Sequence, residues 1–137
     1  MRALALDIGD KTIGIAASDL LGLTAQGVET IRRTSNKDDL KRLAELVAQF
    51  EVKTFVIGLP KNMDGTEGER CEVVRKFASK LSATFPEVDQ IFWDERLSTV
   101  AAAKNLIAAD VSRKKRKKVI DKMAAVYILQ GWLDKGN

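Results

Sequence analysis

Apolar residues alternate with polar ones in some stretches of the chain and recur at helical spacing in others. Alternating or continuous apolar runs predict strands at residues 3–8, 13–18, 28–31, 54–59 and 88–93. Apolar residues three and four positions apart predict helices at residues 38–50, 69–83, 98–109 and 116–133. Ser35 or Asn36 is suited to cap the first helix, and Ser98 the third.

The order of these elements predicts the fold class. Asp10 and Lys11 form a tight turn between the first two strands, which therefore pair as a hairpin. The run at 54–59 is apolar throughout and ends at Pro60, as expected for a central strand buried on both faces. We expect one domain over residues 1–137 with an α/β fold. Its mixed five-stranded sheet is antiparallel in the first three strands, parallel in the later βαβ units, and covered by helices on both faces.

Composition narrows the possible chemistry. Hydrophobic residues make up 45% and charged residues 31% of the chain, as in soluble globular proteins. No apolar run reaches membrane-spanning length and no signal peptide is visible, so we expect a cytoplasmic protein without a membrane partner. One cysteine and no histidine exclude a disulfide framework and imidazole catalysis, and they argue against a zinc site.

Positive charge is concentrated in one stretch. The net charge of +4 is compatible with a polyanionic partner, and six consecutive cations occupy residues 113–118. Such a run is often only a solvated surface, but beside a metal-binding carboxylate it is suited to hold phosphates. The predicted nucleic-acid contacts are Lys11, Arg96, Arg113, Lys114, Lys115, Arg116, Lys117 and Lys118.

Acidic residues in apolar surroundings are the main candidates for chemistry. Asp7 ends the first strand, Asp94 and Glu95 follow the last strand, and Asp121 lies on a helix side with Ala124 and Ala125. Each has a simpler interpretation. Asp7 can cap its hairpin, Glu95 can pair with its neighbour Arg96, and Asp121 can stabilise a helix N-terminus.

Together these carboxylates indicate a different role. Buried carboxylates are costly unless they are paired, and a hard divalent cation held by their oxygens is such a partner. Such a cation also catalyses phosphodiester cleavage. Asp94 and Glu95 are not distinguished by the pattern, and the glycine-rich loop after Gly58 is suited either to touch substrate or to be a flexible turn.

Several motifs along nearly the whole chain resemble the YqgF/RuvX family of the RNase H-like superfamily, whose members are described as Holliday junction resolvases or pre-16S rRNA nucleases. The matching stretches are Asp7-Ile8-Gly9, Ile13-Gly14-Ile15-Ala16, Ser18-Asp19, Val56-Ile57-Gly58-Leu59-Pro60, Met63-Asp64-Gly65-Thr66, Asp94-Glu95-Arg96-Leu97-Ser98-Thr99, Asp121-Lys122-Met123-Ala124-Ala125 and Ile128-Leu129-Gln130. Thr12 is a departure, because the family often carries arginine there.

The resemblance implies an RNase H-like fold in which Asp7, Glu95 and Asp121 are the metal ligands, and it favours Glu95 over Asp94. It implies hydrolysis of phosphodiester bonds with two Mg²⁺ or Mn²⁺ ions, one to activate water and one to stabilise the leaving oxygen. The expected substrate is structured RNA, with maturation of the pre-16S rRNA 5′ end as the lead. Branched DNA at a Holliday junction is the alternative. Ribosomal particles are a further expected partner.

Two other functions fit parts of the sequence. A nucleotide-binding ATPase of the actin or hexokinase type shares the start Asp7-Ile8-Gly9 followed by a hairpin, but it needs two such domains. A catalytically silent nucleic-acid-binding regulator would use the cationic run without needing three converging carboxylates. A junction resolvase cuts two symmetric strands and should dimerise, so both a monomer and a homodimer remain open.

Overall fold

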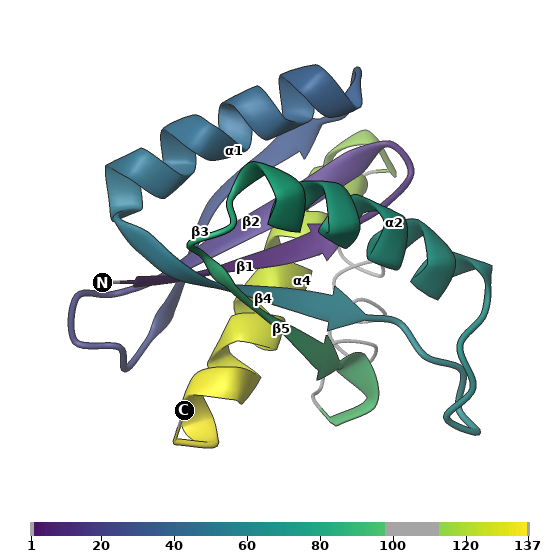
Figure 1. Ribbon diagram of the computed structural model, residues 1–137. Coiled ribbons are helices and arrows are strands. Elements are labelled where there is room, and N and C mark those ends of the chain that lie inside the picture. Colours follow the sequence, from purple (N-terminus) through teal and green to yellow (C-terminus); the bar gives the residue numbers. More distant parts are fainter. Residues whose placement is uncertain (1, 98–112, 137) are drawn as a thin grey trace.

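A single five-stranded sheet forms the centre of the molecule (Figure 1). The computed structural model describes residues 2–97 and 113–136, with side chains described for residues 2–97 and 123–136. The strands are β1 (Arg2–Ile8), β2 (Thr12–Ser18), β3 (Ala25–Arg32), β4 (Val52–Leu59) and β5 (Asp89–Asp94). Strands β1, β2 and β3 form an antiparallel meander, β4 runs parallel to β1, and β5 runs parallel to β4. The order β3-β2-β1-β4-β5 confirms the predicted mixed sheet.

Helices cover both faces of this sheet, as predicted. In Figure 1, α1 (Asn36–Phe50) and α2 (Glu69–Thr84) lie on one face, and α4 (Arg113–Asp134) crosses the other. A short 3-10 helix, η1 (Glu95–Leu97), follows β5. The helix predicted at 98–109, with its cap Ser98, lies outside the described residues. No described helix is both long and apolar enough to cross a membrane.

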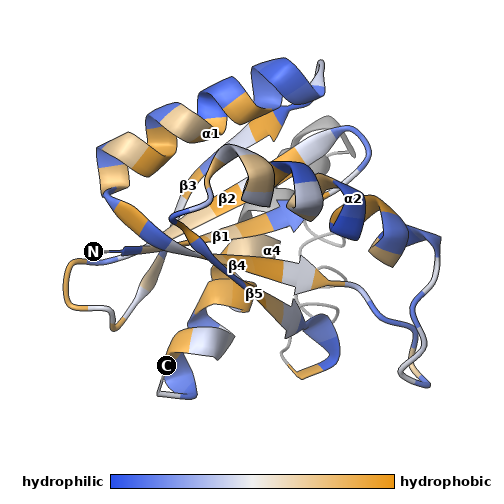
Figure 2. Cartoon of the chain, viewed as in Figure 1, coloured by the Kyte–Doolittle hydropathy of each residue, from blue (hydrophilic) through white to orange (hydrophobic). Residues whose placement is uncertain are grey.

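Each face of β1 contributes to a different core. Leu4 and Leu6 are fully buried in the cluster formed with α1 and α2, whereas Ala3 and Ala5 belong to the cluster formed with α4. This follows from the period of two along a strand. On α4, the residues that meet the sheet include Ala124 and Ala125, whose small side chains let the helix backbone lie close to the strands. Figure 2 shows that the strands in the middle of the molecule are largely hydrophobic. The helices on either side of them carry both hydrophobic and hydrophilic residues.

The ends of α1 have clear local causes. Ser35 is the N-cap, and its hydroxyl oxygen accepts a hydrogen bond from the backbone N–H of Asp38 at 3.1 Å. Glu51 ends the helix in the left-handed region at φ 50°. Of the two cap residues that the sequence suggested, the structure therefore selects Ser35.

The third strand is longer than its apolar pattern predicted. It begins at Ala25 instead of 28, and Gly27 lies within it, paired with Ala16. The register shifts between Ile15 and Ala16 at this point. Pairing with β2 supplies backbone hydrogen bonds that offset the weak strand preference of glycine, so the glycine does not end the strand.

Candidate active site

Asp7 lies at the carboxyl end of β1, on the face of the sheet that α4 covers. It follows Ala3 and Ala5 along that face and is only 9% exposed. Its β2 partner is Gly14. Burying a charged carboxylate costs several kcal/mol unless hydrogen bonds or cations compensate the charge. The structure thus buries Asp7 in the sheet, in agreement with the apolar surroundings that its sequence position indicated.

Gly58 leaves space for a second carboxylate one strand away. Leu6 pairs with Ile57 in the parallel β1–β4 ladder, and extending that register by one residue sets Asp7 beside Gly58. A Cβ atom on Gly58 would lie 3.2 Å from Oε2 of Glu95 and 2.4 Å from Cδ1 of Ile128 in α4. Any side chain at position 58 would therefore enter the space that Glu95 and Ile128 occupy. The glycine matters here because of close packing.

Asp94 and Glu95 have different surroundings although they are adjacent. Asp94 forms a bidentate ion pair with Arg96, with 2.7 Å between Oδ2 and Nη2. Hydrogen bonds from the Arg96 side chain, more than any other contact, lower the pKa of Asp94. Glu95 instead directs a carboxylate oxygen toward Gly58. Of the two acids that the pattern left undistinguished, Glu95 is the one whose carboxylate faces Gly58, the position that the β1–β4 register sets beside Asp7.

Helix α4 carries Asp121 across the same face. Ala124, Ala125 and Ile128 are buried against the sheet in the cluster that also holds Ala5. Helical periodicity puts position 121 on this side of α4, one turn before Ala125. The side chain of Asp121 lies outside the described side chains. Within the part of the chain whose side chains are described, no group of three potential metal ligands gathers.

The matches to known proteins agree with this architecture. The profile of the RuvX family, described as a Holliday junction resolvase, matches residues 1–135. The chain belongs to the RuvX family. A relative from Myxococcus xanthus named "Putative pre-16S rRNA nuclease" is 58% identical over 134 residues, or 98% of this chain and 88% of the relative. A relative of the same name from Clostridioides difficile is 57% identical over 133 residues, or 97% of this chain and 94% of the relative.

Solved structures share the fold of this RuvX-family chain. RuvC from T. thermophilus in complex with a Holliday junction substrate superimposes with a TM-score of 0.65 at 12% identity, covering 100% of this chain and 97% of RuvC. Fowlpox virus resolvase with Holliday junction DNA gives 0.55 at 9% identity, covering 98% of both chains. At such identities the likeness concerns the fold, and it confirms the predicted RNase H-like architecture.

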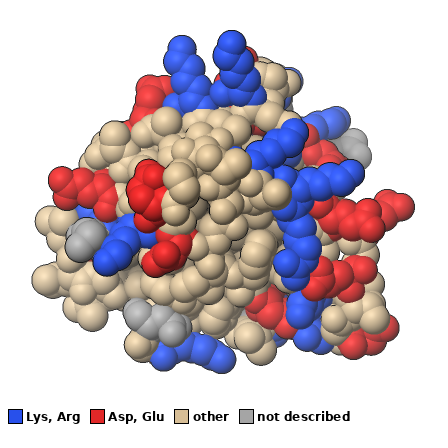
Figure 3. All heavy atoms as spheres, viewed as in Figure 1, with Lys and Arg blue, Asp and Glu red and all other residues tan. Residues whose placement is uncertain are grey.

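The cations predicted to contact nucleic acid are in different situations. Lys11 is exposed in the β1–β2 turn, whereas Arg96 is engaged by Asp94. Residues 113–118 form the first turns of α4, and their side chains lie outside the described ones. Figure 3 shows the face with α1 and α2, where Lys and Arg side chains are interspersed with Asp and Glu. That face offers no broad surface of one sign. Because α4 covers the other face of the sheet, the assignments of residues 113–118, like that of Lys11, stay predictions.

One buried polar cluster beside the RuvX-family motif Asp7-Ile8-Gly9 was not anticipated from the sequence. The Arg33 Nε donates to the 2%-exposed Asp39 carboxylate at 3.0 Å, and its Nη1 donates to the Gly9 carbonyl oxygen at 2.9 Å. The backbone N–H of Arg33 also donates to the Lys11 carbonyl oxygen at 2.8 Å. Arg33 thus ties the turn that follows Asp7 to the start of α1. An ion pair six residues apart gives no periodic signal that would have revealed it.

Proposed function

We propose that this protein is a divalent-metal-dependent nuclease that hydrolyses phosphodiester bonds, with Asp7, Glu95 and Asp121 as its metal ligands. The observation that carries the proposal is the space at Gly58, which admits the Glu95 carboxylate on the face where Asp7 is buried. Helix α4, which bears Asp121, packs on that same face. Membership of the RuvX family supports the same activity.

The proposed donor set suits Mg²⁺ or Mn²⁺. All three groups are carboxylates, which hard cations prefer, and the chain has no histidine. Cys71 is buried in the core on the opposite face of the sheet, so it does not compete as a ligand. When bound, such ions, two in our proposal, supply an activated water and charge stabilisation for the leaving oxygen.

The protein supplies rigid positions for these donors. Asp7 is fixed by strands on both sides of β1, and Glu95 is fixed where β5 ends beside β4. Positioning of this kind reduces the entropy lost on reaching the reactive geometry. Because no histidine is present, the protein contributes ligands and orientation, and water is the nucleophile in the proposed reaction.

As the substrate we propose the 5′ end of pre-16S rRNA, which the protein would cleave either in free RNA or within a ribosomal particle. The curated relatives at 57–58% identity carry the corresponding name. A four-way DNA junction is the second candidate. The description of the family and the junction-bound RuvC structure of the same fold favour it. Arg113–Lys118 and Lys11 are proposed to contact the phosphates of either substrate.

A cleavage assay in Mg²⁺ or Mn²⁺ tests the proposal. It offers a pre-rRNA 5′-end substrate and a four-way junction to the wild type and to Asp7→Asn, Glu95→Gln and Asp121→Asn. Each variant should lose cleavage but keep most of its binding, because the cationic residues are unchanged. Asp10→Asn and Glu87→Gln, both exposed, are matched controls that should cut normally.

The outcomes separate the candidates. Cleavage of the RNA alone supports the ribonuclease, and paired symmetric cuts in the junction support the resolvase. If all three carboxylate variants still cut, the assignment of the metal site is wrong. A third outcome favours a catalytically silent regulator over a nuclease. In that case the wild type binds both substrates but cuts neither. Its cellular role is then lost when Lys114, Lys115, Lys117 and Lys118 are replaced, but is kept in Asp7→Asn.

A further inference from the structure

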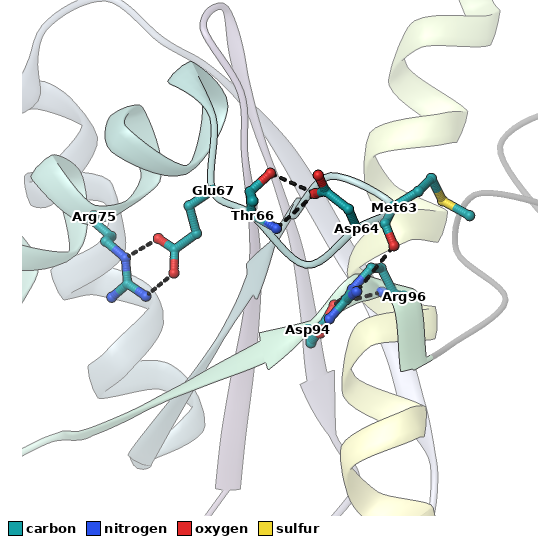
Figure 4. Close-up of polar contacts among 7 residues, drawn as sticks. All are labelled: Met63, Asp64, Thr66, Glu67, Arg75, Asp94 and Arg96. Atoms are coloured by element: carbon teal, nitrogen blue, oxygen red, sulfur yellow. Dashed lines mark hydrogen bonds and ion pairs between the residues drawn. The ribbon is translucent and has the colours of Figure 1, made fainter.

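Arg96 links the end of β5 to the loop that precedes α2 (Figure 4). Its Nε donates to both oxygens of Asp94 at 3.1 Å, and its Nη2 donates to Oδ2 at 2.7 Å. The backbone N–H of Arg96 also donates to Oδ1 of Asp94 at 3.0 Å. On its other side, Nη1 donates to the carbonyl oxygen of Met63 at 3.3 Å. The guanidinium therefore contacts two segments that are more than thirty residues apart.

This arrangement fixes the residue between the two partners. Glu95 stands between Asp94 and Arg96, whose side chains and backbone are joined by four hydrogen bonds. These four hydrogen bonds hold the turn from which the Glu95 side chain projects. With Asp94 and Arg96 facing each other, the Glu95 carboxylate reaches the space beside Gly58.

The loop at residues 60–68 is shaped to accept Arg96. Gly65 has a φ of +91°, and a Cβ there would lie 3.3 Å from Arg96 Nη1. Asp64 accepts hydrogen bonds from the backbone N–H and hydroxyl of Thr66 at 3.0 and 2.6 Å. Glu67 at the far end of the loop pairs with Arg75 of α2, with 2.6 Å between Oε1 and Nε. The loop is thus held at its tip by Arg96 and at its base by Arg75.

We propose that Arg96, with Asp94 as its partner, is a positioning residue that holds Glu95 and the 60–68 loop in place for catalysis. This role stands in place of the phosphate contact that the sequence suggested for Arg96, and it rests on the proposed nuclease function. The geometry supports it, because the positive charge of Arg96 is compensated by Asp94 and three of its side-chain nitrogens already donate hydrogen bonds. Lysine cannot reproduce the bidentate contact, although it keeps the charge.

The experiment compares cleavage kinetics and salt-dependent binding of the full-length wild type with Arg96→Lys, Arg96→Gln, Asp94→Asn and the double variant Asp94→Asn/Arg96→Gln. Arg42→Gln, which breaks the ion pair with Glu29 between α1 and β3 and does not touch the 60–68 loop, is the control. Positioning predicts that Arg96→Lys and Asp94→Asn each lower kcat roughly ten- to hundredfold with little change in KM. The double variant should be no worse than the worse single variant, and Arg42→Gln should keep its kcat.

A phosphate contact predicts a different set of results. Arg96→Lys would then cut normally, Asp94→Asn would bind tighter, and Arg96→Gln would raise KM and reduce the salt slope of binding by about 0.9. That set overturns the proposal, as does a normal kcat in both Arg96→Lys and Asp94→Asn. Thermal unfolding of each variant separates loss of fold from loss of rate. A wild type that cuts nothing contradicts the proposed nuclease, whereas an active wild type with unaffected variants contradicts only the positioning role.

Discussion

Replacing Gly58 with alanine should damage both the core and the site, and a second substitution should separate the two effects. The added Cβ would lie 2.4 Å from Ile128 Cδ1, whereas carbon atoms in contact prefer about 3.5–4.0 Å. Ile128 is fully buried, so its side chain must move by more than about 1 Å within a packed core. Overpacking of this kind costs about 1–3 kcal/mol of unfolding free energy. For a domain of this size, the melting temperature should fall by about 4–12 °C.

The same Cβ also presses on Glu95. Its distance of 3.2 Å from Oε2 is tighter than ordinary contact, so the carboxylate must shift by a few tenths of an ångström. Small displacements of catalytic groups lower rates strongly. With Glu95 as a proposed metal ligand, we expect Gly58→Ala to reduce kcat roughly ten- to hundredfold. The assay is metal-dependent cleavage measured beside thermal unfolding.

Ile128→Val distinguishes packing from positioning because it removes Cδ1, the closest of the three atoms that the added Cβ would meet, and leaves at this side chain only the 3.3 Å contact with Cγ1. Alone it should cost about 0.5–1.5 kcal/mol and leave cleavage intact. Combined with Gly58→Ala, it should bring stability back to near that of Ile128→Val alone, while kcat stays low because Glu95 is still displaced. Full recovery of kcat together with stability in the double variant would refute the reasoning. A Gly58→Ala variant as stable as the wild type would refute the packing contact itself.

Three further experiments test other parts of the structure. Asp39→Asn should lower the free energy of unfolding in urea by about 3 kcal/mol, because it breaks a buried ion pair with Arg33. The control Asp38→Asn, at an exposed position, should change this free energy little, and equal effects of the two substitutions would contradict the burial of Asp39. Replacing Lys114, Lys115, Lys117 and Lys118 with glutamine should reduce the salt slope of nucleic-acid binding by about 0.9 for each lysine that contacts a phosphate, and an unchanged slope would show a merely solvated run. Burial raises the pKa of the Cys71 thiol, so a disulfide reagent at pH 8 should label it only after denaturation, and rapid labelling of the native protein would contradict its position.

The sheet and the helices α1, α2 and α4 were predictable because their signals are local. Leu4 and Leu6 alternate with Ala3 and Ala5, and the structure buries these two pairs on opposite faces of the sheet, with Asp7 on the face of the alanines. The spacing in α1 and its serine cap are likewise contained within a few residues. The length of β3 was underestimated, because pairing with β2 is not visible in its own composition.

The site was only partly predictable because it depends on contacts between distant segments. The pattern could not choose between Asp94 and Glu95. Glu95 faces Gly58 of β4, whereas Asp94 pairs with Arg96, which in turn donates to the carbonyl oxygen of Met63. The absence of a side chain at Gly58 is important only because the β1–β4 and β4–β5 registers bring that position between two acids.

Charged residues were the hardest to interpret. Arg33, Asp39 and Arg96 belong to residue types that mostly lie on solvated surfaces, and nothing in their sequence context separated them from Lys11. Their roles come from burial and from partners that the fold supplies, such as the Gly9 carbonyl oxygen for Arg33. Residue type therefore indicated the chemistry of the site, whereas the fold determined which charges are structural.

The most direct test of the central claim is the position of bound Mn²⁺ in a crystal of the full-length protein, located by its anomalous scattering. The proposed site predicts that Mn²⁺ is bound by carboxylate oxygens of Asp7, Glu95 and Asp121 beside Gly58, and that it is lost in Asp7→Asn. Mn²⁺ found only at other residues, in a preparation that cleaves nucleic acid with Mn²⁺, would contradict the proposed site.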